Sequence, residues 1–167
     1  MFRVRLLVFL PVLFFCARAR GAPGNLDPTF NGSGSTIITF PDSVDFGTAT
    51  AVQPDGKIVV VGRAQNGHDF DFFVMRYNPD GSLDTTFGDE GKVLTAMRRT
   101  DDGATGVKIQ PDGKLVVCGY SEIEGLISSF AVVRYHSDGS LDSSFSEDGK
   151  LSTSIGPGED GGESVAI

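Results

Sequence analysis

The chain has 167 residues, of which 22 are glycine, and 22 acidic against 14 basic side chains give it a net charge of −8. The length suits one ordinary domain, and a hydrophobic content of 40% excludes a disordered chain. The glycine content excludes a helical bundle, and the acidic balance excludes a nucleic-acid-binding surface, which would need basic side chains.

The N-terminal segment 1–22 is typical of a secretory signal peptide. Arg3 and Arg5 precede an apolar run over Leu6–Cys16, and a small-residue cleavage motif ends at Ala19. The run is too short to span a membrane as a helix, although a single-pass anchor is the alternative. We therefore predict a protein that is secreted, periplasmic or held at the cell surface, without a membrane span after cleavage.

Cleavage after Ala22 would remove four arginines and Cys16, which leaves 10 basic against 22 acidic residues and a net charge of −12. Cys118 would then be the last cysteine, so no internal disulfide is expected. Stability must come from packing, from a metal or from other chains.

The remainder, 23–167, is a repeat region. Gln53–Lys57 recurs as Gln110–Lys114 at an offset of 57, and Arg76–Phe87 recurs as Arg134–Phe145 at an offset of 58. Units begin near residues 26, 83 and 141, and the last is incomplete. About two and a half units are therefore present.

Each unit predicts four short strands. In the middle unit we expect them over 92–97, 103–109, 114–120 and 130–135. Pro-Asp-Gly between the second and third strands predicts a hairpin, because proline presets φ and glycine adopts positive φ. We therefore predict an all-β fold of antiparallel four-stranded blades like those of a β-propeller.

Phenylalanines recur after each Leu-Asp segment, at Phe30, Phe87 and Phe145, and we expect them to wedge between blades. We predict that the aromatic run Phe70–Phe73 packs into the core at the start of a strand, and a ligand-stacking platform is the alternative. Asn31 begins a formal glycosylation sequon that is read as a turn.

Aspartates recur at equivalent positions, and we interpret them as acceptors of backbone N–H bonds in turns. These are Asp55, Asp80, Asp84, Asp112, Asp138 and Asp142. The alternative is weak Ca²⁺ binding in loops, although no EF-hand spacing occurs. Arg76 and Arg134 also recur, each beside a tyrosine, and are expected to bridge acids of a neighbouring loop.

Chemistry-bearing residues that do not recur form no catalytic or metal motif. His68 and His136 lack a third ligand at zinc spacing, and Cys118 replaces Val61 of the preceding unit, so it is read as a small buried hydrophobe. No catalytic, cofactor or metal residue is assigned. In a propeller the variable loops 65–71 and 121–129 would carry specificity. Their polar residues, which are the candidates for a pocket, are His68, Asp69, Glu122 and Glu124.

Three motifs carry a family resemblance over Leu26–Ile167. They read Gln-Pro-Asp-Gly-Lys-Ile/Leu-Val-Val, Phe-x-Val-x-Arg-Tyr and Asp-Gly-Ser-Leu-Asp-x-x-Phe, and they resemble the delta-60 repeat. That family occurs largely in bacterial secreted and surface proteins. The resemblance implies a β-propeller and brings no catalytic residue with it.

We expect a non-enzymatic scaffold or interaction surface without a cofactor. Its partners would be further repeats of the same or another chain, or an extracellular protein or glycan, and not nucleic acid. A closed propeller needs at least four blades, so we predict either a fragment of a longer protein or a ring of copies. The alternative is a ligand-binding or enzymatic propeller with a glycan or small-molecule pocket, assisted by calcium.

Overall fold

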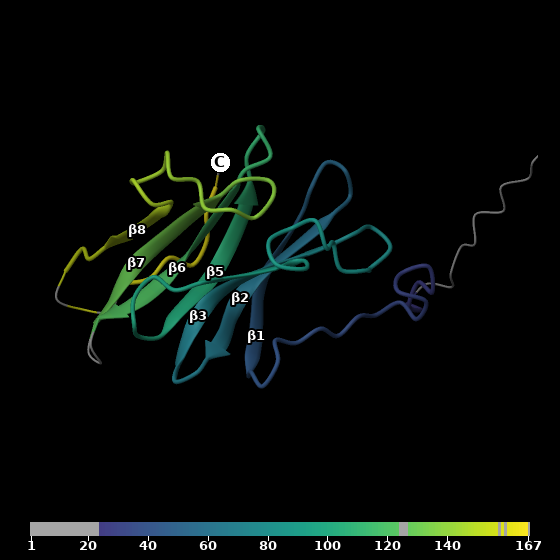
Figure 1. The fold of residues 1–167 in the computed structure, drawn as a ribbon, viewed down its shortest axis with the longest axis horizontal. Coiled ribbons are helices and arrows are strands. Elements are labelled where there is room, and N and C mark those ends of the chain that lie inside the picture. The colour runs from purple at the N-terminus through teal and green to yellow at the C-terminus, as the bar shows by residue number, and fades with distance from the viewer. Residues whose placement is uncertain (1–23, 124–126, 157, 159, 167) are drawn as a thin grey trace, which may run out of the picture.

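The computed structural model describes residues 24–123, 127–156, 158 and 160–166, so the predicted signal peptide lies outside the described residues. Two four-stranded antiparallel sheets make up the fold (Figure 1). The first contains β1 (Asp45–Val52), β2 (Ile58–Asn66), β3 (Asp69–Tyr77) and β4 (Lys92–Thr95), and the second contains β5 (Asp102–Ile109), β6 (Leu115–Ile123), β7 (Ile127–Tyr135) and β8 (Lys150–Thr153). Within the described part of the chain, no helix has the length and apolarity needed to cross a membrane.

In each sheet the strands lie side by side in chain order, as in a propeller blade. This arrangement confirms the predicted all-β fold of antiparallel four-stranded blades. The strands β6 and β7 are longer than expected, since their pairing runs from Leu115 and Tyr135 as far as Ile123 and Ile127.

The Pro-Asp-Gly hairpins form as predicted. In the first, Gly56 has a φ of 86°, the N–H of Gln53 donates to the carbonyl of Lys57 at 2.8 Å, and the N–H of Gly56 donates to Gln53 at 2.9 Å. The second hairpin repeats this geometry, with Gly113 at a φ of 84°. Residues other than glycine rarely adopt such a backbone angle, so the turn requires glycine here.

The grouping of strands into sheets differs from the sequence prediction. We expected 92–97 as the first strand of the middle unit, but β4 pairs with β3 and completes the first sheet. The loop between them folds back, because Asp84 donates its N–H to the carbonyl of Arg76 and Arg76 donates to that of Gly91. The strand β8 closes the second sheet in the same way. Repeat length alone cannot show which sheet a strand joins, and each unit in fact supplies one strand to the sheet before it.

The core lies between the two sheets, which pack face to face. The first sheet contributes Val59, Val61, Phe72 and Val74, and the second contributes Leu115, Val117, Ala131, Val133 and Tyr135. The other face of the first sheet is also apolar, and Ile38 and Phe40 from the preceding segment cover it. Both faces are therefore buried, which explains why Ile58–Val61 lacks polar alternation.

The first sheet buries one face against the second sheet, and the equivalent face of the second sheet is only partly covered. Phe130 and Val132 are the repeat counterparts of Phe72 and Val74, and they line an apolar depression of about 260 Å³. Leu151 and Ile155 on its rim are 41% and 75% exposed. The C-terminal segment returns beside β6, where Gly162 donates its N–H to the carbonyl of Gly119 (Figure 1, yellow).

Candidate functional site at the junction of the two blades

A threonine in the first strand of each sheet makes a hydrogen bond to the sheet or segment that follows. Thr48 lies at the β-bulge of β1, and its hydroxyl donates to the carbonyl of Val61 at 3.1 Å and to that of Ala104 in β5 at 2.6 Å. Thr105, its counterpart in β5, donates in the same way to Cys118 and to Gly162. The contact between successive blades is therefore a repeated feature.

Loops make the second set of repeated contacts. The N–H of Asn31, in the turn expected there, donates to the carbonyl of Asp80 at 2.6 Å, and the N–H of Gly88 donates to that of Asp138 at 2.8 Å. The two bonds are related by the repeat, since each joins a loop after the Leu-Asp segment to the Asp-Gly turn of the sheet that follows.

The recurring phenylalanine packs against that same turn. Phe87 is fully buried in the core between the sheets, with the guanidinium of Arg76 4.5 Å from its ring centroid. A Cβ on Gly139 would lie 3.0 Å from the ring, so this approach requires glycine. Phe30 stands equally close to Gly81. The expected wedge between blades is confirmed at Phe87.

An aspartate organises the charged groups next to each wedge. In the first blade, Oδ2 of Asp84 accepts from Nε of Arg76 at 2.6 Å and from Nζ of Lys57 at 2.8 Å, while Oδ1 accepts from the hydroxyl and N–H of Thr86. The guanidinium of Arg76 also donates to the carbonyl of Ser137 in the second blade. The expected role of Arg76 as a bridge to a neighbouring acid is confirmed.

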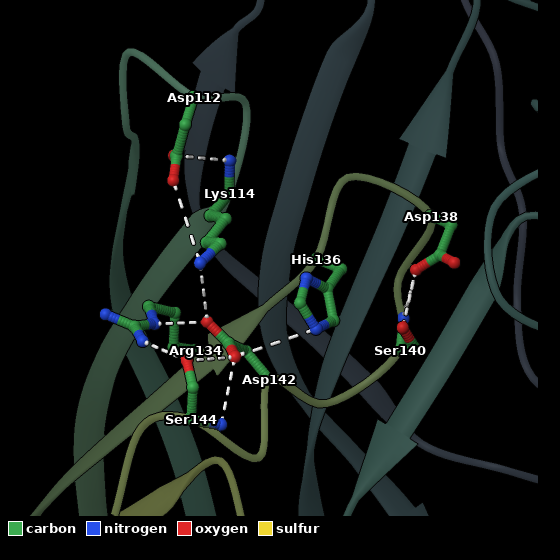
Figure 2. Close-up of polar contacts among 8 residues, drawn as sticks. All are labelled: Asp112, Lys114, Arg134, His136, Asp138, Ser140, Asp142 and Ser144. Carbon is green, nitrogen blue, oxygen red and sulfur yellow. Dashed lines mark hydrogen bonds and ion pairs between the residues drawn. The ribbon is translucent and has the colours of Figure 1, made fainter.

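Figure 2 shows the same arrangement in the second blade. Asp142 accepts from Arg134 at 2.7 Å and from Lys114 at 3.0 Å, and Ser144 donates both its hydroxyl and its N–H. The imidazole of His136 lies 3.6 Å from the same carboxylate. His136 therefore lies beside this network of charged groups.

The surroundings of both aspartates favour the charged carboxylate. At Asp84, burial by itself would raise the pKa, but the hydrogen bonds from Lys57, Thr86 and Arg76 outweigh it and hold the pKa well below its usual range. At Asp142, the hydrogen bond from the Ser144 hydroxyl is the main cause of an equally depressed pKa.

The remaining recurring aspartates act within turns, as expected. Oδ1 of Asp55 accepts from the N–H of Lys57 at 3.2 Å, and Asp112 does the same for Lys114. Asp80 and Asp138 each accept from the N–H and hydroxyl of the serine two residues on, as Figure 2 shows for Asp138 and Ser140.

Sequence reasoning missed another repeated aspartate, which begins the first strand of each sheet at Asp45 and Asp102 and recurs in the C-terminal segment at Asp160. Asp45 accepts from the N–H of Phe40 at 2.9 Å, Asp102 from that of Met97 at 2.7 Å, and Asp160 from that of Ile155 at 2.7 Å. Each of these aspartates holds the backbone of the segment that precedes it in the chain. The same offsets of 57 and 58 relate these three residues, so the repeat itself could have revealed them.

At the end of the junction away from Phe87, the two blades meet through residues that do not recur in the repeat. The guanidinium of Arg63 lies 4.9 Å from the ring centroids of both Phe46 and Phe70, and it donates to the hydroxyl of Tyr120 at 2.8 Å. Phe70 therefore packs around an arginine, whereas Phe72 and Phe73 enter the core as expected.

The structure does not gather the polar candidates of the variable loops into one site. His68 is exposed in the turn between β2 and β3, and Asp69 follows it at the start of β3. Glu122 lines a separate polar depression of about 510 Å³ with Tyr120 and Asp160. Glu124 lies outside the described residues. Among the residues that are described, no three His, Cys, Asp or Glu side chains form a group that could hold a metal ion.

Cys118 lies buried in β6, opposite Val132, and burial raises the pKa of its thiol. A neutral thiol is a poor nucleophile, so its surroundings agree with the interpretation as a small hydrophobe.

Comparison with known families agrees with this architecture. Residues 53–87 and 110–145 match the family described as "Domain of unknown function (DUF5122) beta-propeller". Each match runs from the Pro-Asp-Gly hairpin to the recurring phenylalanine. No curated protein is significantly similar to the chain. With two matched units on two stacked four-stranded sheets, the chain has the all-β fold of repeated β-propeller blades.

Proposed function

We propose that this is an exported β-propeller repeat protein of the delta-60 type, whose blades form a non-enzymatic scaffold or interaction surface. One observation carries the proposal: the contacts between the blades repeat along the chain, and the second sheet presents the next copy of the same contact face. The occupant proposed for that face is a further blade of the same design.

The charged and aromatic groups of the second blade support this choice. The side chain of Arg76 is 7% exposed where the second blade covers it, whereas its counterpart Arg134 is 21% exposed. Phe87 is fully buried and its counterpart Phe145 is half-buried. A blade placed on the second sheet as that sheet lies on the first would cover both Arg134 and Phe145.

The apolar character of the face supports it as well. Phe130, Val132 and Leu151 present hydrocarbon to water, and such a surface favours burial against another apolar face. In the first sheet the equivalent surface meets Val133 and Tyr135, so the matching surface is already defined by the repeat.

A pocket-based function is the second candidate. Three residues that line the polar depression, Tyr120, Glu122 and Ser128, differ from their counterparts in the preceding unit, and the depression has the size of a small-molecule or sugar site. Binding of a glycan there would make the propeller a ligand-binding module.

Light scattering on the purified chain without residues 1–22 tests the scaffold proposal. We expect association that increases with concentration, and we expect Val132→Asp to abolish it because the substitution places a charge in the contact face. Leu151→Lys, at an exposed site, serves as a second variant that does not disturb the core. Lys108→Asp, at an exposed site of β5, is the matched control and should associate like the original protein.

A monomer at every concentration that melts in one cooperative transition would refute the proposal that copies assemble. Export is tested separately, by N-terminal sequencing of the protein recovered from the extracellular and periplasmic fractions. We expect a mature N-terminus near residue 20–23, and recovery of the intact Met1 form inside the cell would contradict it.

A further inference from the structure

Two buried carboxylates meet where the start of β3 touches the start of β5. The N–H of Phe70 donates to Oδ1 of Asp101 at 2.9 Å, which joins the two strands at this point. The next residue on each strand is an aspartate, and Asp71 and Asp102 are 2% and 0% exposed. They are therefore buried together between the blades.

Each carboxylate has one oxygen that is satisfied and one that is not. Oδ2 of Asp71 accepts from the amide of Asn66 at 2.8 Å, and Oδ2 of Asp102 accepts from the N–H groups of Met97 and Arg98. Oδ1 of Asp71 and Oδ1 of Asp102 are both buried without a hydrogen-bond partner. Unpaired buried polar atoms of this kind are rare in folded proteins, and each calls for an explanation.

A third oxygen with the same property lies beside them. Ser121 is the register partner of Asp102 across β5 and β6, so the two side chains lie on the same face of the sheet. Ser121 is fully buried, and its Oγ makes no hydrogen bond of normal geometry, although it lies close enough to the Asp102 carboxylate to lower the pKa of that group.

No basic side chain of the described residues forms an ion pair with either aspartate. Arg63, from the same end of the first sheet, is occupied by the Phe46 and Phe70 rings and by Tyr120. Burial raises the pKa of Asp71 and of Asp102, and the charge of Asp71 adds to the effect at Asp102. Two buried carboxylates without a counter-charge need neutralisation.

We propose that Asp71, Asp102 and Ser121 bind a divalent cation of the calcium type at the junction of the two blades. Calcium takes about six to eight oxygen ligands, and carboxylates, hydroxyls and carbonyls are the groups that it prefers. The three unpartnered oxygens supply part of this set, and water completes it. This site is separate from the recurring turn aspartates, which are engaged by N–H and hydroxyl donors.

The repeat shows that the site belongs to one junction. Asp71 is replaced by Ser129 in the next unit, and Ser121 corresponds to Ala64 in the preceding one. The hydroxyl of Ser129 is hydrogen-bonded to that of Ser154. Asp71→Ser and Ser121→Ala therefore each install a residue that the same fold accepts elsewhere.

Calorimetric titration with calcium chloride and melting curves of the purified chain test the proposal. We expect one calcium ion per chain, and a melting temperature that rises by roughly 5–10 °C when calcium exceeds its Kd about a hundredfold. Asp71→Ser should abolish both the binding heat and the shift, and Ser121→Ala should weaken binding about tenfold. Asp138→Asn, at an exposed turn, is the control and should keep the full response.

Absence of heat and of a melting shift in the original protein would overturn the proposal. So would a calcium response that survives in Asp71→Ser, because the ion would then be bound elsewhere. A third contrary result is a protein that ignores calcium and gains stability on acidification in a way that Asp71→Ser removes. In that case the two carboxyls share a proton. None of these outcomes depends on how many blades assemble.

Discussion

Thr48 and Ala104 are 56 residues apart in the chain, yet the hydroxyl of Thr48 donates to the carbonyl of Ala104 at 2.6 Å. The same hydroxyl lies 3.1 Å from the carbonyl of Val61 in its own sheet. One side chain at a β-bulge thus connects the first strands of two successive sheets. Because a bulge changes the direction of a side chain relative to its neighbours, it gives Thr48 access to both carbonyls.

Replacing Thr48 by valine should lower the free energy of unfolding by about 1 kcal/mol, because the hydrogen bond to Ala104 is lost while side-chain volume is kept. Urea unfolding followed by circular dichroism measures this. Thr50→Val, on the same strand at an exposed position, is the matched control and should change stability by less than about 0.5 kcal/mol. Equal effects at the two positions would show that the contact between the sheets is not what Thr48 contributes.

Replacing Phe87 by alanine should cost roughly 3–5 kcal/mol, because it opens a cavity in the core shared by the two sheets. Phe145→Ala removes the same side chain from a half-buried position and should cost clearly less. Guanidinium unfolding distinguishes the two variants. We also expect the Phe87 variant to lose cooperativity and to unfold in two steps. A single sharp transition with little loss of stability would contradict the wedge.

Replacing Asp84 by asparagine should destabilise the protein by about 3 kcal/mol. The substitution leaves Arg76 buried without its carboxylate, and the cost of an unpaired buried charge exceeds that of a lost surface contact. Asp55→Asn is the control, because Asp55 is exposed and accepts one turn N–H, which asparagine also accepts. The comparison uses urea midpoints at neutral pH, and similar losses in both variants would argue against the buried pair.

The stability supplied by Asp84 should disappear in acid. Its pKa in the folded protein is depressed below the unfolded value of about 3.9, so its contribution is present above that pH and is lost as the pH falls towards the folded pKa. The stability difference between the original protein and Asp84→Asn should therefore shrink by about 1.4 kcal/mol per pH unit below 3.9.

Urea unfolding of both proteins at pH 7, 4 and 2.5 gives this difference. Comparing the two proteins cancels the opposite contribution of Asp71 and Asp102, whose raised pKa values favour the folded state at low pH. A difference that is the same at pH 2.5 as at pH 7 would contradict the assignment.

Local patterns predicted most of the strands and turns. The Pro-Asp-Gly hairpins, the extended run beginning at Leu115 and the buried wedge at Phe87 all follow from short-range rules that act within one unit. The pairing of β4 with β3 could not be found in this way. It depends on the backbone hydrogen bonds of the Asp84 loop, and a periodic sequence looks the same whichever strand is taken as the first.

Some contacts between the blades could also be predicted from the sequence, and others could not. Thr48 with Thr105, and Asp45 with Asp102, recur at the offset of 57 and were open to detection from the sequence. Asp71 was not, because its importance arises from the neighbouring Asp102, which lies 31 residues away in the chain and on another sheet. A site made by one junction carries no periodic signal.

The strand β4 also has a consequence for how such a chain can lengthen. If one unit of the sequence is copied in tandem, its first strand completes the sheet that precedes it. Its last three strands form a new sheet, and the following copy supplies the fourth strand of that sheet. Duplication of a gene segment can thus add blades while every interior strand keeps a hydrogen-bonded neighbour. Deletion of part of a unit has the opposite effect: a chain cut before Lys150 would expose the edge of β7 from Phe130 to Val133, a template for aggregation.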